Sequence, residues 1–418
     1  METGDLQFFE FFSNIKMCGV IFMAEEKQKR RRTFNLPVIF GVTLMTVLGV
    51  SSVSPAFPAI MSALNITETQ VGLLITVFTL PGVVLTPLMG VAADRFGRKK
   101  VLIPSLLLFG IAGGMVGFSQ NFSTLLLLRF FQGMGAAGLG SLNVTIIGDL
   151  YGGNERTKVM GLNASVLSIG TAVYPLIGGS LAAISWNFPF LLPWLAVPLG
   201  IAAMLFLKIP EPENNQHFKL YLRNAWFGIK DQKVIGIFVA GVLVFIILYG
   251  SYLTYFSILL GGVYQASSFI IGLLMFSMSI TTAIVASQLG RLNKRFSKQS
   301  LLKVGFCGYA TSMVMIPFVH ELWFFLLPIL IFGVGHGLIM PSLQALLAEQ
   351  APMKLRGIYM ALNGAMLRIG QTTGPLLIGL VYMVGGFTSA FFGGALIAVI
   401  GLLVVHFMVA CFDATGRL

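Results

Sequence analysis

Long apolar runs separated by short polar segments fill the chain from residue 37 to residue 411. A helix needs about 20 apolar residues to cross a bilayer. Runs long enough to do so predict twelve membrane-spanning helices, six in each half of the chain, at 37–61, 70–92, 101–119, 124–149, 159–184, 189–207, 234–260, 269–290, 301–319, 322–349, 357–384 and 388–411. The pattern therefore predicts an all-α membrane protein.

The longest polar break divides these helices into two groups of six. We expect an N-terminal tail, an N-terminal six-helix bundle, a linker, a C-terminal six-helix bundle and a C-terminal tail, at 1–36, 37–207, 208–233, 234–411 and 412–418. The linker is expected to hold a short surface helix at 218–229. Two interpretations fit residues 1–22: they form an interfacial helix rich in phenylalanine, or they precede the true start at Met23.

The composition agrees with this pattern and argues against a soluble enzyme. Of the 418 residues, 56% are hydrophobic and 10% are charged, and the mean hydropathy is +0.88. A soluble domain carries roughly 25% charged residues. The three cysteines and four histidines show no disulfide or metal-ligand spacing. We expect no metal, no organic cofactor and no enzymatic activity.

The basic residues lie on one predicted side of the membrane. The chain has 27 Lys and Arg residues, and two of them, Arg129 and Arg368, lie inside predicted helices. The others fall in the tails, in the linker, in the loops between helices 2 and 3, 4 and 5, 8 and 9, and 10 and 11, or at the helix ends beside these loops. Basic residues collect on the cytoplasmic side, so both termini are expected there. The same asymmetry explains the net charge of +12 without nucleic-acid binding.

The two halves share an internal repeat at an offset of 200 residues. Arg156, Leu162, Asn163, Gly170 and Pro175 align without gaps with the same residue types at 356, 362, 363, 370 and 375. Two parallel six-helix repeats are typical of one class of secondary transporter, in which the substrate binds near the midplane between the repeats.

Three motifs make the chain resemble the major facilitator superfamily, and within it the twelve-helix drug:proton antiporters. The loop 2–3 motif has Gly90, Asp94, Arg95, Gly97, Arg98 and Lys99. The fourth-helix motif has Arg129, Gln132, Gly133 and Gly135. The fifth-helix antiporter motif has Gly161, Gly170, Pro175, Gly178 and Gly179, with Tyr174 where the family pattern prefers glycine; Gly374 and Pro375 occupy the corresponding place in the second half.

The resemblance implies a secondary active transporter that works by alternating access. It implies export of small hydrophobic compounds, drug-like and neutral or weakly anionic, in exchange for protons, with the proton gradient as energy source. The expected partners are lipid, protons and a small-molecule substrate, the expected location is the cell inner membrane, and the expected functional unit is a monomer.

The loop motif is expected to act as a latch. Asp94 is expected to cap a helix N-terminus of the other half, where negative charge is favoured. By resemblance, Arg98 pairs with the acid near the end of helix 4, which here is Asp149. The alternative is a plain basic turn at the membrane surface. The glycines and prolines of the antiporter motif are expected to allow tight packing that seals the pathway.

Four residues inside the predicted helices, among them Gln132 of the fourth-helix motif, are candidates for coupling or substrate contact. A buried guanidinium is expensive and usually functional. Arg129 either couples protons, as the resemblance implies, or joins helices through hydrogen bonds. Arg368 lies about 16 Å into helix 11, near the midplane, and is expected to face the cavity. His336 either titrates or is a neutral, hydrogen-bonded core residue.

The remaining polar residues of the helices are either cavity-lining or packing residues. The tyrosines of helix 7 are spaced i, i+3, i+6 and are expected to share a face. The candidates are Asn143, Asn163, Tyr249, Tyr252, Tyr255, Gln344, Asn363 and Gln371. No carboxylate lies near the midplane, which argues against lipophilic cations as main substrates.

Two alternatives to a drug exporter stay open. The first is an organic-anion carrier of the same fold, with Arg129 and Arg368 as charge partners of the substrate. The second, more remote, is a membrane enzyme or a non-transporting sensor. It would require a catalytic constellation or a large soluble domain, and the sequence has neither.

Overall fold

The computed structural model describes residues 35–207, 209, 231–351 and 356–410. Within these residues every regular element is a helix, as the apolar runs predicted. The N-terminal segment and the surface helix expected at 218–229 lie outside the described residues.

The helices of the first half follow the predicted spans closely. The first span is Asn35–Leu64, which ends in η1 (Ser54–Ala56) and α2 (Phe57–Leu64). The others are α3 (Glu68–Phe96), α4 (Arg98–Met115) with η2 (Val116–Phe118), α5 (Phe122–Leu150), α6 (Gly153–Ile184), and η3 (Phe188–Leu195) with α7 (Ala196–Phe206).

The second half repeats this order. Its seventh span is built from α9 (Gln232–Ile246), the π-helix η4 (Ile247–Phe256) and α10 (Ser257–Gly262). It continues with α11 (Ser268–Leu292), α12 (Lys298–Met315) with η5 (Ile316–Phe318), η6 (Leu322–Phe325) with α13 (Leu326–Gln350), α14 (Arg356–Val404) and η7 (Val405–Ala410).

Helix α14 is two crossings joined by a glycine break. It has 49 residues, and an unbroken helix of that length would measure about 74 Å, more than twice the hydrocarbon thickness of a bilayer. Gly385 and Gly386 have non-helical backbone angles inside it, and Gly386 has φ +66°. The eleven long apolar helices of the described residues therefore contain twelve crossings, and the break falls between the predicted spans 357–384 and 388–411.

Side-chain caps fix several helix starts. Thr67 forms a capping box with Gln70 at the start of α3, and Asn121, Ser267 and Ser297 accept bonds from the first turns of α5, α11 and α12. Each cap satisfies a backbone N–H that has no partner inside the helix. These caps fix where the helices begin after the short loops.

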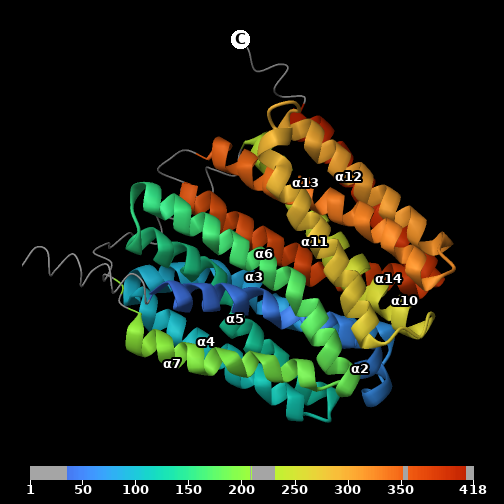
Figure 1. Ribbon diagram of the computed structural model, residues 1–418, viewed down its shortest axis with the longest axis horizontal. Helices are drawn as coiled ribbons and strands as arrows, with labels where there is room; N and C mark the ends of the chain where they lie inside the picture. The colour runs from blue at the N-terminus through green and yellow to red at the C-terminus, as the bar shows by residue number, and fades with distance from the viewer. Residues whose placement is uncertain (1–34, 208, 210–230, 352–355, 411–418) are drawn as a thin grey trace, which may run out of the picture.

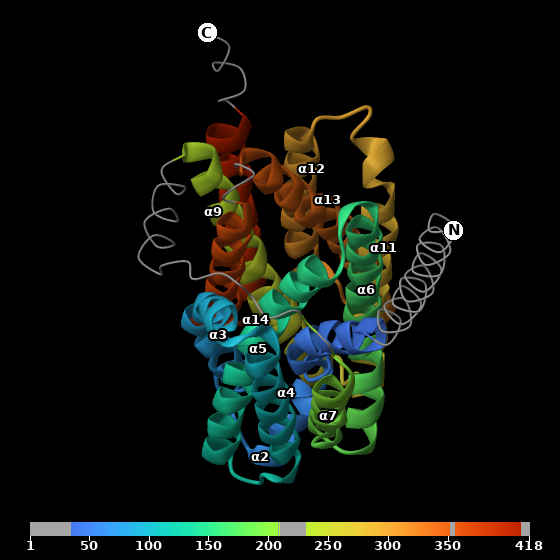
Figure 2. The ribbon, with the colours of Figure 1, turned by 90° about the vertical axis from the view of Figure 1, so that its left-hand side faces the viewer.

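The helices of each half pack on one another, and two pairs join the halves. Figure 1 shows long helices of both halves packed side by side. In Figure 2, α3, α4, α5 and α7 of the first half lie below α9, α12 and α13 of the second half. Between the halves, α3 packs against α14 and α6 packs against α11. Since lipid is as apolar as leucine, such contacts depend on close packing and hydrogen bonds rather than on the hydrophobic effect.

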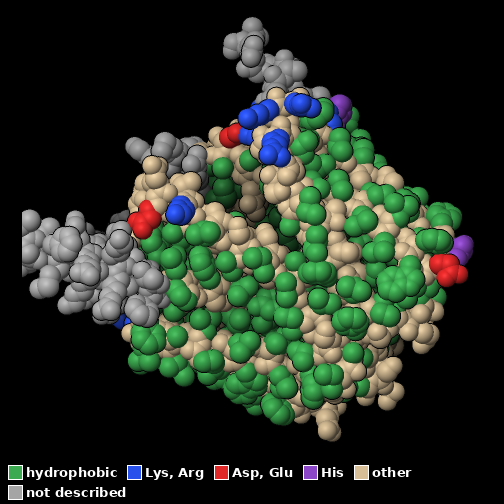
Figure 3. Space-filling view, viewed as in Figure 1, with side chains coloured by type: hydrophobic (Ala, Val, Ile, Leu, Met, Phe, Trp, Pro, Cys, Tyr) green, Lys and Arg blue, Asp and Glu red, His purple; other side chains and the backbone are tan. Residues whose placement is uncertain are grey.

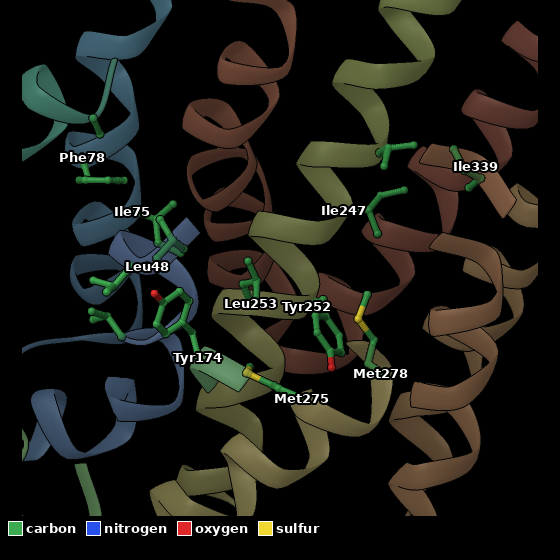
Figure 4. Packing of buried hydrophobic residues seen from close by; sticks show 14 of the residues in the cluster. Leu48, Ile75, Phe78, Tyr174, Ile247, Tyr252, Leu253, Met275, Met278 and Ile339 are labelled. Carbon is green, nitrogen blue, oxygen red and sulfur yellow. The ribbon is translucent and has the colours of Figure 1, made fainter. Parts of the chain in front are cut away.

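Buried apolar side chains of both halves form one continuous cluster. In Figure 4, Tyr174 lies beside Leu48, and Met275 lies nearby on the side of the second half. Leu48 is fully buried and Met275 is 1% exposed. The two halves are therefore packed together over part of their length.

Candidate functional site

The contact between α6 and α11 is made by small residues of the antiporter motif. A Cβ atom at Gly179 would overlap the carbonyl oxygen of Ser268, and one at Gly272 would overlap the carbonyl of Pro175. Gly178 lies in the same way against the carbonyl of Ser52 in the first span. Only glycine lets the backbones come this close, which is how small residues bring membrane helices together.

The contact between α3 and α14 is a row of small and hydroxylated residues. A Cβ atom at Gly72 would lie 3.4 Å from Cβ of Pro375. Next, the Thr76 hydroxyl donates to the carbonyl of Thr372 at 3.1 Å, and the Thr372 hydroxyl donates to that of Thr79 at 2.9 Å. Together with the α6–α11 contact, this row closes one side of the molecule between the halves.

The opposite side of the molecule, which carries the basic loops and is called the basic side below, is open between the halves. In α6, Ala164, Ser165, Leu167 and Ser168 are exposed, whereas the second half of the helix packs closely. In α11 no residue from 279 to 288 is buried. Figure 3 shows the surface hollowed between the start of α6 and the turn that joins α11 to α12. The structure is therefore sealed on one side and open on the basic side.

The loop motif contains the expected ion pair. Arg98 Nε donates to Asp149 Oδ2 at 3.0 Å, and Arg98 Nη1 bonds Asp94 at 2.5 Å and the carbonyl of Ala93 at 2.9 Å. At an offset of 200 residues, Lys298 forms an ion pair with Glu349. Both halves therefore join the start of their third helix to the end of their fourth.

Asp94 does not make the contact expected of it within the described residues. Its side chain is 57% exposed, and its ion pair is with Arg98, four residues along the same loop. The segment that precedes α14, residues 352–355, lies outside the described part of the chain.

Other residues of the loop motif serve local geometry. Gly97 ends α3 with φ +101°, a conformation that favours glycine, and Gly90 has open space beside it. Lys99 Nζ donates to the carbonyl of Met204 at 2.6 Å. Arg95 lies over the ring of Phe96, 5.6 Å from its centre.

Arg129 is enclosed by protein. It is fully buried and donates to the carbonyl oxygens of Gly49 at 2.8 Å and Leu74 at 3.3 Å, and to Gln132 Oε1 at 2.8 Å. Its guanidinium also lies 4.5 Å from the ring centre of Phe78. These contacts join the first span, α3 and α5, as the hydrogen-bonding interpretation expects. Arg129 does not border the open side, and neither does Gln132, which is fully buried.

His336 belongs to an aromatic stack in the second half. The hydroxyl of Tyr309 and Nδ1 of His336 are hydrogen-bonded at 2.5 Å. The Tyr309 ring stacks on Phe332 at 4.1 Å, and Phe332 stacks on Tyr252 at 4.9 Å. His336 is therefore hydrogen-bonded inside the packed helices, and it is part-buried.

The three tyrosines of the seventh span do not share a face, contrary to the prediction. They lie in the π-helix η4, whose wider turn rotates i, i+3 and i+6 away from one another. Tyr252 stacks on Phe332, and Tyr255 lies beside Tyr382 with ring centres 5.0 Å apart. Both are buried in packed contacts, whereas Tyr249 is only partly buried and lies near Arg368.

Asn143 and Asn163 are buried within the first half rather than lining a cavity. Asn143 Nδ2 donates to Thr43 Oγ1 at 2.5 Å and to Asn163 Oδ1 at 3.2 Å, and Thr43 is hydrogen-bonded to Asn163. The exposed fractions are 2% for Thr43, 3% for Asn143 and 8% for Asn163. This polar cluster joins the first span, α5 and α6. Thr43 was missed because a threonine in an apolar run gives no signal of its partner.

The remaining candidates are placed as follows. Gln344 is exposed, Asn363 is part-buried, and Gln371 is 8% exposed and accepts from Arg368 Nη1 at 3.0 Å. Gly161 has open space beside it, Gly170 packs on Leu44 and Val47, and Gly374 packs on Gly250 and the carbonyl of Ile246. Among the described residues, no three His, Cys, Asp or Glu side chains gather as a metal site would require.

A family model described as the Major Facilitator Superfamily matches residues 39–267 and 254–413. The chain belongs to the major facilitator superfamily. It is therefore a multi-pass membrane transporter and not an enzyme, as the sequence motifs indicated. Transporters of this superfamily act on small molecules.

Relatives of known name agree with the resemblance to drug:proton antiporters. The chain is 26% identical over 356 residues to the bacillibactin exporter of Bacillus subtilis (strain 168), covering 82% of this chain and 88% of that protein. It is 25% identical over 365 residues to the quinolone resistance protein NorA of Staphylococcus aureus (strain COL), covering 84% and 88%.

Solved structures of other transporters share the fold. A mutant of the nucleoside transporter NupG superimposes with a TM-score of 0.76 at 14% identity, covering 90% of this chain and 99% of that one. The human organic anion transporter MFSD10 (TETRAN) superimposes with a TM-score of 0.67 at 18% identity, covering 89% and 99%.

Proposed function

We propose that this transporter exports small hydrophobic compounds, neutral or weakly anionic, in exchange for protons by alternating access. The observation that carries the proposal is the seal between α6 and α11, where Gly179 and Gly272 bring backbone against backbone. It is built from the motif that the chain shares with exporters, and it closes one side while the basic side is open. Relatives named as exporters and resistance proteins support the same direction of transport.

The orientation follows from the charges. The open side carries the basic loops, and such loops stay in the cytoplasm. We propose that the structure is the inward-open state, that both termini are cytoplasmic, and that the protein functions as a monomer in the cell inner membrane. In this arrangement residues 37–207 and 234–411 are the two six-helix domains, and 208–233 is the linker between them.

Proton exchange requires a group that binds and releases a proton. Within the described helices the acids lie at the ends, and no Asp or Glu lies near the middle of a span. His336 lies in the interior of α13, and histidine is the side chain that changes charge nearest to physiological pH. We assign proton coupling to His336 and its partner Tyr309, and positioning of the loop motif within the first half to the Arg98–Asp149 pair.

The test uses inverted membrane vesicles that contain the full-length protein and are acidified inside. Three hydrophobic probes are added: the neutral 1-naphthamide, the anion 1-naphthoate and the cation tetraphenylphosphonium. The first two are expected to raise the internal pH, as read by a fluorescent pH probe, and Asp149→Asn is expected to slow this response. Gly364→Ala is the matched control, because the added methyl group has nothing within 4 Å.

The outcomes separate the parts of the proposal. No proton movement with any of the three probes would reject proton antiport. A response to tetraphenylphosphonium alone would reject the substrate class. A response to the neutral probe that is the same in vesicles without the protein would reject transport as its cause.

A further inference from the structure

Arg368 stands apart from the other charged groups of the described helices. It and Arg129 are the two charged side chains in the interior of the spans, and Arg129 is fully buried with carbonyl partners. Arg368 is part-buried, and among the described residues its guanidinium makes a single hydrogen bond, to Gln371. A guanidinium has five N–H donors, so most of those of Arg368 are left for another partner.

The position of Arg368 lies between the two halves. A Cβ atom at Gly82 of α3 would lie 3.1 Å from Cδ and 3.2 Å from Nε of Arg368. The side chain therefore reaches from α14 across to the first half, and a Cβ atom at position 82 would require it to shift by a few tenths of an ångström. Arg368 is also the last contact in the row that begins at Gly72 and Pro375, so it lies where the halves begin to separate toward the open basic side.

Aromatic and polar groups surround the guanidinium. Tyr249 of the π-helix lies near Arg368. The ring of Tyr249 stacks on Phe245, with centres 5.6 Å apart. Both aromatic residues are only partly buried. A guanidinium with a flat apolar wall beside it suits a compound that carries a negative charge and a flat apolar ring.

Arg368 has no acidic partner among the described residues. A guanidinium inside the membrane is costly and normally pairs with another ionisable group or with backbone carbonyls. Among the described residues no Asp or Glu lies in a helix interior. Gln371 and Tyr249 are neutral, so an ionised substrate would supply the counter-charge that these neighbours lack.

We propose that Arg368, with Gln371 and Tyr249 beside it, binds the carboxylate of hydrophobic aromatic acids at the boundary between the halves. This inference rests on the proposed transport function and names the substrate class of its central site. The planar guanidinium matches a planar carboxylate through two parallel hydrogen bonds, and the aromatic wall of Phe245 and Tyr249 contacts the ring of the substrate. Since Gly82 adjoins the bound group, a substrate held here touches both halves.

The test measures equilibrium binding of radiolabelled 1-naphthoate and its uncharged analogue 1-naphthamide to the purified full-length protein in lipid nanodiscs at neutral pH. Wild type is expected to bind the carboxylate more tightly than the amide. Arg368→Gln is expected to weaken binding of the carboxylate by about tenfold or more without changing that of the amide, and Arg368→Lys is expected to recover part of the loss.

A second pair of variants keeps the test decisive if Arg368→Gln fails to fold. Gly82→Ala keeps the guanidinium but displaces it, and is expected to weaken binding of the carboxylate severalfold. Gly364→Ala, one turn from Arg368 on α14 and with open space beside it, is expected to bind as wild type does. Equal binding of the carboxylate in wild type and Gly82→Ala, or equal binding of the two probes to wild type, would overturn the inference.

The vesicle assay separates this inference from the proposed function. If protons move in response to the neutral probe while the carboxylate does not bind, the anion site is wrong and the exporter stands. If the carboxylate binds through Arg368 while no probe moves protons, the anion site stands and proton antiport is wrong.

Discussion

Pro175 of α6 lies against Gly272 of α11, and at an offset of 200 residues Pro375 of α14 lies against Gly72 of α3. The internal repeat therefore builds both contacts between the halves from the same pair of residue types. In each, a proline of one half meets a glycine of the other on the sealed side. We expect these two contacts to separate when the transporter opens to that side.

Adding a methyl group at Gly179 is expected to open the seal. The group would meet the carbonyl of Ser268, and overpacking costs about 1–3 kcal/mol. If the sealed state alone carries this cost, the opposite state gains about 5- to 150-fold in population. The measurement is labelling of a Ser54→Cys reporter, buried in the seal, by an impermeant maleimide added to the sealed side of the Gly179→Ala variant.

The matched control for this experiment is Gly262→Ala. Gly262 lies near the same side, and nothing lies within 4 Å of its added methyl group. All variants are made with the native cysteines replaced by serine. Labelling of the reporter at the wild-type rate in Gly179→Ala would show that the backbone contact does not hold the seal.

The two ion pairs of the basic side are expected to differ in strength. The Arg98 and Asp149 side chains are 9% and 32% exposed, whereas those of Lys298 and Glu349 are 25% and 56% exposed. Asp149→Asn is expected to lower the free energy of unfolding by about 1–3 kcal/mol, and Glu349→Gln by less than about 1 kcal/mol. Thermal unfolding of the two variants in detergent measures the difference.

High salt provides a second check on the same pairs. Exposed pairs are screened more strongly than buried ones, so added salt is expected to remove the effect of Glu349→Gln and leave most of that of Asp149→Asn. Equal losses in the two variants at low salt would contradict the ranking by burial.

The topology could be predicted because it depends on length and pattern. A run of about 20 apolar residues has few other uses, and the repeat fixes how the two halves correspond. The last two spans follow the same argument: they were predicted separately at 357–384 and 388–411, and the turn between them depends on the backbone freedom of Gly385 and Gly386.

The candidate site could be predicted only in part, because residue type does not give side-chain direction. Asn143 and Asn163 are polar and inside helices, as cavity residues are, yet Thr43 satisfies them within the first half. The shared face expected of the tyrosines assumed an α-helix, and the π-helix changes the rotation per residue. Gly82 was missed because its role depends on Arg368 of the other half.

Replacing Arg129 is expected to destabilise the first half. Arg129→Met would leave the buried carbonyls of Gly49 and Leu74 and the amide of Gln132 without their donor. Each buried polar group left unpaired costs about 1–3 kcal/mol, so the variant is expected to unfold at a much lower temperature. Arg129→Lys keeps the charge but not the planar guanidinium with its several donors, and its unfolding temperature is expected to be intermediate.

The two interpretations of Arg129 predict different results for Arg129→Lys. If the residue joins helices, thermal stability and transport fall together. If it couples protons, the variant folds and binds substrate normally but loses proton movement in the vesicle assay. Normal stability with lost proton movement would therefore contradict the structural role.

His336 is expected to be required for proton movement but not for substrate binding. It lies in the interior of α13, and Tyr309 is hydrogen-bonded to its Nδ1 at 2.5 Å. His336→Gln keeps a polar side chain without a group that titrates near neutral pH. It is expected to abolish substrate-dependent proton release in the vesicle assay while binding of 1-naphthamide stays at the wild-type level.

The aromatic stack supplies the matched pair of controls. Tyr309→Phe removes the hydroxyl that positions the imidazole and is expected to slow proton release severalfold. Tyr252→Phe removes a buried hydroxyl that has no hydrogen-bond partner in the described residues. Removing this hydroxyl is expected to leave proton release unchanged and to raise the free energy of unfolding by up to about 1 kcal/mol. Proton release that persists in His336→Gln would show that the proton is carried elsewhere, and equal slowing in Tyr309→Phe and Tyr252→Phe would show that the stack acts through packing alone.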